Sequence, residues 1–97
     1  DADQLRRVHA HLEVYSGLAN YRNSWLRQGF DDSDLVRGGS DRLARALAGM
    51  GAVESAAVAV RAHLDAGADH VVIQALGDTP TDDPRPALRE LAAALGL

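Results

Sequence analysis

The sequence predicts an α/β fold that is mostly helical and contains one buried parallel strand at about residues 70–76. Two observations support this prediction. Val71-Val72-Ile73 is a continuous β-branched run, the pattern of a strand that is covered on both faces. Elsewhere, apolar residues recur at the 3.6-residue spacing of helices, and polar or glycine-rich turns separate those stretches. A chain of this kind that folds alone is expected to be helix-rich.

Five helices are expected, at about residues 2–16, 19–28, 41–50, 54–66 and 84–95. Ser40 or Asp41 can cap the third helix through a side-chain oxygen. Gly67 suits the left-handed backbone at the end of the fourth helix, and the strand follows at once. Pro84 can open the last helix. The order helix, glycine turn, buried strand, loop and helix is one rung of a βα ladder.

The predicted strand has no partner within the chain. A buried strand without a neighbour leaves backbone N–H and C=O groups unpaired, which is costly. The segment can pair with another part of a larger protein, pair with its copy in a second chain by edge addition, or be covered by helices in a nearly all-α fold. The chain begins at Asp1 and its single methionine is Met50, so we expect it to be a piece of a longer protein.

Composition argues against several classes of function. The 97 residues suit one small domain, and a net charge of −4 gives no basic footprint for nucleic acid. There is no cysteine, which rules out disulfides and thiolate metal sites and fits a cytoplasmic location. No apolar stretch is long enough to span a bilayer, so we expect no membrane partner. All ten basic residues are arginine, which indicates a GC-rich genome.

No metal site is expected from the acidic residues and histidines. His9 and His11 lie two residues apart on a predicted helix, so they point to different faces and cannot chelate one ion. Asp31, Asp32 and Asp34 resemble the start of a calcium loop, but the glycine and the closing glutamate of such loops are missing. Helix capping explains these aspartates better.

The run Arg37-Gly38-Gly39-Ser40 ahead of a helix has three interpretations. Exposed backbone N–H groups and the helix dipole can bind an anion there. The run can also be a degraded carrier-protein motif whose serine receives phosphopantetheine, although the usual pattern has a residue between the glycines and the serine. The third interpretation is an ordinary glycine-containing helix start.

Tyr21, Arg22 and Gln74 are the candidate cofactor-binding residues, and no catalytic residue is assigned. Tyr21 and Arg22 belong to an aromatic and polar cluster that suits either the wall of a polar ligand site or a helix–helix corner. Gln74 lies near the carboxyl end of the predicted strand, where ligands bind in α/β barrels. It can instead hydrogen-bond a neighbouring loop.

Several segments resemble the C-terminal part of luciferase-like flavin-dependent oxidoreductases, and most closely the actinobacterial branch predicted to use coenzyme F420. The resemblance covers nearly the whole chain. Its most specific stretch is His63-Leu64-Asp65-Ala66-Gly67-Ala68-Asp69-His70-Val71. The other matching segments are residues 18–23, 26–30, 38–43 and 61–62.

The resemblance implies that residues 1–97 are the C-terminal piece of a single (β/α)₈ TIM barrel, with the eighth strand near 71–76 and the closing helix near 84–95. It also implies transfer of a hydride between reduced FMN or F420 and a small organic substrate, or a monooxygenase reaction. The cofactor supplies that chemistry and the protein positions it.

Most cofactor and catalytic contacts of such a barrel lie in the seven strands that this chain lacks. The isolated piece is therefore expected to bind no cofactor and to be inactive. Its expected partners are the remainder of the barrel or a second copy of the chain, in a homo-oligomer. The alternative, from a different class, is a small acidic helical interaction or carrier-type domain.

Overall fold

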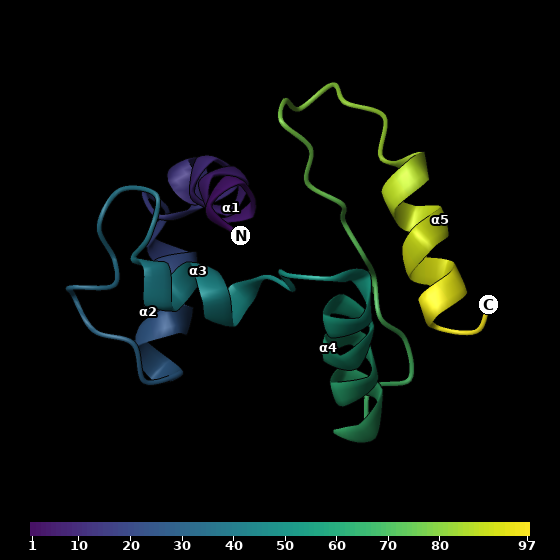
Figure 1. Cartoon of the computed structure of the whole chain (residues 1–97). Helices are drawn as coiled ribbons and strands as arrows, with labels where there is room; N and C mark the ends of the chain where they lie inside the picture. The colour runs from purple at the N-terminus through teal and green to yellow at the C-terminus, as the bar shows by residue number, and fades with distance from the viewer. The chain divides into compact units, whose positions relative to one another are not determined.

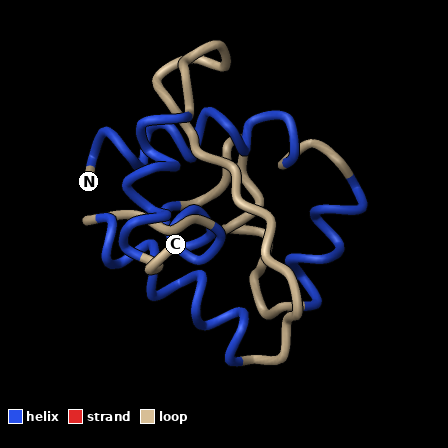
Figure 2. The backbone as a smooth tube through the Cα atoms, turned by 90° about the vertical axis from the view of Figure 1, so that its right-hand side faces the viewer, coloured by secondary structure: helices blue, strands red, loops and turns tan.

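The computed structural model describes every residue from Asp1 to Leu97 and contains five helices and no strand (Figures 1 and 2). The prediction of a helix-rich chain is therefore confirmed. The chain divides into two compact units, Asp1–Ala48 and Gly49–Leu97. The helices are α1 (Ala2–Tyr15), α2 (Ala19–Arg27) and α3 (Asp41–Leu47) in the first unit, and α4 (Val53–Asp65) and α5 (Arg85–Ala94) in the second.

The first unit has its own hydrophobic core, in which α1 packs against α3. The core forms because Val8 and Leu12 lie one helical turn apart on α1 and are both buried. Leu43 of α3 is 0% exposed, and α2 contributes Trp25, the single tryptophan of the chain. The buried hydrophobic residues of this unit are Val8, Leu12, Trp25, Leu35, Leu43 and Ala44.

The start and end of α3 follow from local sequence. The Ser40 hydroxyl accepts a hydrogen bond from the backbone N–H of Leu43 at 3.0 Å, which satisfies one of the free donors of the first turn. The helix ends at Leu47 rather than near residue 50, because Ala48 is extended, with φ −129° and ψ 139°, and glycine follows it.

The second unit has a thinner core. Helix α4 packs against α5, but Ala57 is the single buried hydrophobic side chain of the unit and α5 has none. The Arg61 guanidinium adds a hydrogen bond to the Ala94 carbonyl at 2.9 Å. In Figure 1, α4 and α5 run in the same direction, and the chain between them returns the opposite way. Because no side chain of α5 is buried, packing between these two helices stabilises the unit only weakly.

The buried parallel strand predicted at residues 70–76 is wrong, and with it the assignment of the chain to an α/β fold as the last piece of a (β/α)₈ barrel. Residues 69–77 have no regular secondary structure and form no backbone–backbone hydrogen bond. Val72 is 86% exposed and Ile73 is 38% exposed. The physical reason is that a strand needs a partner for its N–H and C=O groups, and the chain has no second β segment.

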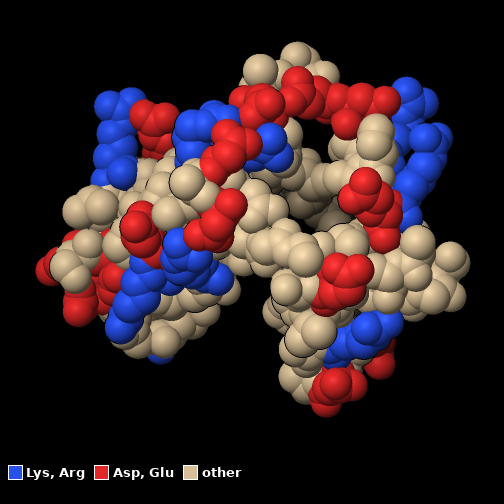
Figure 3. Space-filling view, in the orientation of Figure 1, with Lys and Arg blue, Asp and Glu red and all other residues tan.

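Charged groups cover much of the surface, and acidic side chains gather over the loop that precedes α5 (Figure 3). Asp78, Asp82 and Asp83 belong to this loop. The longest helix, α1, has 14 residues, and no helix combines the length and the apolar character that a membrane crossing requires.

Candidate functional site

The densest set of polar contacts in the first unit surrounds the turn at Gly38-Gly39, and His9 is its anchor on α1. His9 Nδ1 lies 2.9 Å from the Gly38 carbonyl oxygen, and Nε2 lies 2.7 Å from Asp41 Oδ1. A carbonyl and a carboxylate can only accept, so both ring nitrogens must carry a proton if both bonds are to form. The two contacts therefore favour the imidazolium form of His9. The hydrogen bond that His9 donates to the Gly38 carbonyl, and then the one to Asp41, raise the pKa of His9 above the usual value.

Two consecutive glycines make this close approach possible. Gly38 and Gly39 have φ values of 79° and 78°, in the left-handed region that side chains disfavour. A Cβ atom on Gly38 would lie 3.2 Å from the His9 carbonyl oxygen. The Gly38 N–H donates to the Ser16 hydroxyl at 3.0 Å. Gly38 thus binds α1 through its carbonyl group and Ser16, the residue that follows α1, through its N–H group.

Asp34 organises the loop on the other side of this turn. Asp34 is only 4% exposed. Its carboxylate accepts a hydrogen bond from the Ser40 hydroxyl at 2.6 Å and another from the Asp31 N–H at 3.1 Å. Arg42 lies 3.3 Å away as a third partner. These contacts lower the pKa of Asp34, the Ser40 hydrogen bond most of all. A buried carboxylate with this many donors is a structural group that holds the loop in place.

The Ser40 hydroxyl is occupied by these same contacts, since it donates to Asp34 and accepts from the Leu43 N–H. This bears on two interpretations of the glycine–serine run. As a phosphopantetheine attachment point, the hydroxyl would have to leave both partners. As an anion site, the start of α3 is flanked by the carboxylates of Asp34 and Asp41, which repel an anion. The geometry supports the third interpretation, an ordinary capped helix start.

Arg22, one of the predicted cofactor-binding residues, makes structural contacts. Its Nη1 donates to the carbonyl oxygens of Ser16 and Leu35, at 2.9 Å and 2.7 Å. These are the first residue after α1 and a core residue of the loop before α3. A charged donor shared by two carbonyls ties the two segments together. The sequence placed Arg22 in a polar cluster but could not identify carbonyl partners that are distant in the chain.

Tyr21 and Gln74, the other two predicted residues, lie in different units. Tyr21 is 39% exposed, and its ring meets the ring of Tyr15 edge-on at a centroid distance of 4.9 Å and that of Trp25 at 6.1 Å. This aromatic row is a helix–helix corner, with one tyrosine face open. Gln74 is exposed within residues 69–77 of the second unit. Tyr21 and Arg22 lie in the first unit and Gln74 in the second, so neither unit by itself contains all three predicted residues.

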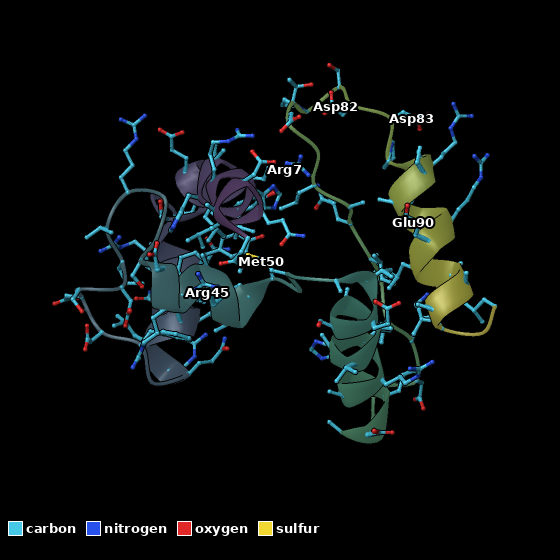
Figure 4. All side chains as sticks on the ribbon, viewed as in Figure 1. Arg7, Arg45, Met50, Asp82, Asp83 and Glu90 are labelled. Atoms are coloured by element: carbon cyan, nitrogen blue, oxygen red, sulfur yellow. The ribbon has the colours of Figure 1, made fainter.

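The acidic loop before α5 is also explained by internal contacts. The Asp82 carboxylate accepts from the backbone N–H of Asp78 at 2.8 Å and from the Thr79 hydroxyl at 2.7 Å, which closes the turn. Asp83 pairs with Arg85, which lowers the pKa of the carboxyl group and raises that of the guanidinium. Figure 4 shows Asp82 and Asp83 following one another along this loop. No group of three or more His, Cys, Asp or Glu side chains is arranged to hold a metal ion.

Sequence reasoning missed the role of His9, which it considered only as a metal ligand. The signal that could have found it is the adjacent pair Gly38-Gly39, because two glycines in succession often mark a close backbone approach. The identity of the approaching group could not be read from the sequence, since His9 and Asp41 are 32 positions apart.

Three comparisons, with models of protein families, with curated proteins and with solved structures, return no match for this chain.

We expect the first unit to lose stability as the pH rises above 6.5 and passes through the folded-state pKa of His9. The pKa of His9 is raised from 6.5 on folding, so the folded state holds the proton more tightly. That stabilisation is complete below the unfolded pKa and is lost above the folded one. The measurement is the urea midpoint from Trp25 fluorescence at about pH 5.5 and about pH 8.5, on either side of the usual histidine range.

His9→Gln should remove most of this difference between the two midpoints, whereas His11→Gln, which alters a ring stacked on Tyr15, should retain it. An unchanged pH difference in the His9 variant would show that another group is responsible.

Arg22→Ala should lower the urea midpoint of the first unit, because it leaves the carbonyls of Ser16 and Leu35 without their shared donor. Arg22→Lys should recover only part of the loss, since an ammonium lacks the planar geometry of the guanidinium. Tyr21→Phe is the matched control on α2 and should leave the midpoint nearly unchanged. If Arg22→Ala has the same urea midpoint as the unsubstituted chain, the two hydrogen bonds do not stabilise the unit. A role of Arg22 in ligand binding would then be favoured.

Proposed function

We propose that this chain is a non-catalytic section of a cytoplasmic flavin- or F420-dependent oxidoreductase of the luciferase-like class. The observation that carries the proposal is the open, apolar stretch at Val71-Val72-Ile73. The most specific part of the resemblance, residues 63–71, leads directly into this stretch. The two features meet at one point of the chain, where the backbone forms no backbone–backbone hydrogen bond.

An exposed apolar stretch of this kind is expected where a segment packs against another polypeptide or against another part of a longer polypeptide. Val72 is 86% exposed, and residues 69–77 form no backbone–backbone hydrogen bond. Complete burial of one such aliphatic side chain stabilises a protein by about 1.5–3 kcal/mol. A partner that covers this stretch would gain that energy and would pair the free backbone groups as well.

In this proposal, the chemical step takes place in parts of the enzyme outside this chain. In the reaction, reduced FMN or F420 gives a hydride to a small organic substrate, and the cofactor supplies that reactivity. Within the chain, Tyr21 and Gln74 are exposed and are free to form part of a ligand wall that other segments complete. Arg22 contributes indirectly, because it holds the loop beside α2 in place.

A small acidic helical interaction domain is the second candidate. The self-contained core of the first unit favours it, because α1, α2 and α3 bury their apolar side chains without help from the rest of the chain. The carrier form of this candidate has less support, since the Ser40 hydroxyl is engaged on both sides.

The isolated chain should show no saturable binding of FMN or F420, measured by the fluorescence anisotropy of each cofactor at increasing protein concentration. The reason is that, by the resemblance, most cofactor contacts are expected in segments outside this chain. Saturable one-to-one binding would contradict a non-catalytic role.

The native protein, captured with an antibody against this chain, separates the two candidates. The oxidoreductase proposal expects a polypeptide longer than 97 residues that carries flavin or deazaflavin fluorescence. A native mass of 10.3 kDa without a cofactor would favour the interaction domain. The same mass with phosphopantetheine on Ser40 would favour a carrier and overturn the proposal.

A further inference from the structure

We propose that His9 is a pH-sensitive switch in the contact between α1 and α3. As a cation it binds both the Gly38 carbonyl and the Asp41 carboxylate, and as a neutral ring it keeps Gly38 and releases Asp41. This inference goes beyond the oxidoreductase assignment and does not depend on it. It rests on the positions of the three groups and on the different exposure of the two acceptors.

The two acceptors on the His9 ring impose two states. The Gly38 carbonyl oxygen lies 2.9 Å from Nδ1, and Asp41 Oδ1 lies 2.7 Å from Nε2. An imidazolium donates from both nitrogens, whereas a neutral ring has one N–H group and one lone pair. Loss of the proton therefore leaves a nitrogen lone pair against an acceptor oxygen, which is repulsive. One of the two contacts must open when His9 becomes neutral.

The Gly38 carbonyl belongs to a turn that is held on several sides. Gly38 is buried, and its N–H donates at 3.0 Å to the hydroxyl of Ser16, which is 3% exposed. The Gly39 N–H donates to the Val36 carbonyl at 2.7 Å, and a Cβ atom on Gly39 would lie 3.1 Å from Leu43 Cδ2. The turn thus contacts the core and cannot swing away alone. Without His9 its carbonyl would lose its donor in a buried residue, which is costly.

The Asp41 carboxylate is free to leave. Its side chain is 71% exposed, so water can replace His9 as its hydrogen-bond donor at little cost. Asp41 is also the first residue of α3, where the helix dipole favours a negative charge after release. Neutral His9 is therefore expected to carry its proton on Nδ1, the tautomer that a backbone carbonyl beside Nδ1 commonly selects.

The charge of His9 itself sets the switch, because Asp41 is the charged side chain in contact with the ring. Arg22 of α2 binds two backbone carbonyls. Charged side chains on α1, on α3 and in the loop before α3 form other pairs: Arg6 and Arg7 with Asp3, Arg37 with Glu13, Arg42 with Asp34, and Arg45 with Asp1.

The direction of the switch follows from the raised pKa of His9. Its hydrogen bonds to Gly38 and then Asp41 raise this pKa above 6.5, so the folded chain holds the proton more tightly than the unfolded chain. Both contacts are complete at lower pH, and Asp41 is released as the pH rises through the folded-state pKa. The first turn of α3 then loses a polar contact with α1, while the glycine turn keeps its own.

Nitrogen-15 NMR of the histidine rings in the full chain tests the tautomer. At about pH 5.5 both ring nitrogens of His9 should have the shifts of protonated nitrogens, and at about pH 8.5 only Nδ1 should remain protonated. His63 and His70, which are exposed in the second unit, are internal references for rings in solvent. A proton on Nε2 of His9 at the higher pH would overturn the proposal.

Nuclear Overhauser contacts test the release of Asp41. At the lower pH the His9 ring protons should show contacts with the α protons of Gly38 and the β protons of Asp41. At the higher pH the Gly38 contacts should remain and the Asp41 contacts should be lost. Any other pattern at the higher pH, including retention of both sets, would overturn the proposal.

Two alanine variants separate the Asp41 contact from the rest of the interface between α1 and α3. Asp41→Ala should lower the pKa of His9, because the cation loses a carboxylate partner, and should leave the proton of the neutral ring on Nδ1. Asp1→Ala removes the carboxylate that pairs with Arg45 across the same interface, and it should change neither property. Trp25 fluorescence checks that both variants fold.

An Nε2–H tautomer in neutral Asp41→Ala, or an unchanged pKa of His9 in that variant, would overturn the proposal. If Asp41→Ala does not fold, the tautomer and the Overhauser contacts of the unsubstituted chain decide the question. None of these results would alter the cofactor-binding test of the oxidoreductase assignment.

Discussion

The need to pair backbone N–H and C=O groups is the constraint on which this structure depends. A helix meets the need within its own segment, and a strand meets it only through a neighbour. The chain therefore folds into helices wherever its periodic stretches allow, and it leaves residues 69–77 open. The β-branched run at 71–73 has the composition of a strand, but composition supplies no partner. The proposed role in a larger enzyme follows from that open edge.

The two units differ in how many apolar side chains they bury and in how their polar groups are hydrogen-bonded. In the first, Leu43 is fully enclosed, and every buried side-chain donor or acceptor has a hydrogen-bond partner. His9, Asp34 and Arg22 fasten long loops that have little hydrophobic content of their own. In the second, Ala57 is the lone buried apolar side chain, and α5 packs against α4 without burying a side chain of its own. The first unit therefore buries more apolar side chains than the second.

The parts of this structure that the sequence could predict are local. The positions of the helices follow from apolar spacing, and the cap of α3 follows from Ser40 three residues ahead of Leu43. The prediction of a strand at residues 70–76 is wrong, because strand formation depends on a pairing segment that is distant in the sequence. The carbonyl partners of Arg22 and the Asp41 partner of His9 are non-local for the same reason. The resemblance to luciferase-like oxidoreductases stays a prediction about function.

Amide hydrogen exchange of residues 69–77 tests the central claim most directly. At a concentration where light scattering shows a monomer, these amides should exchange about as fast as in an unfolded chain, while buried amides of α1 and α3 are protected. Protection of residues 70–76 in the monomer, independent of concentration, would show that the segment has a partner inside the chain and would contradict this account.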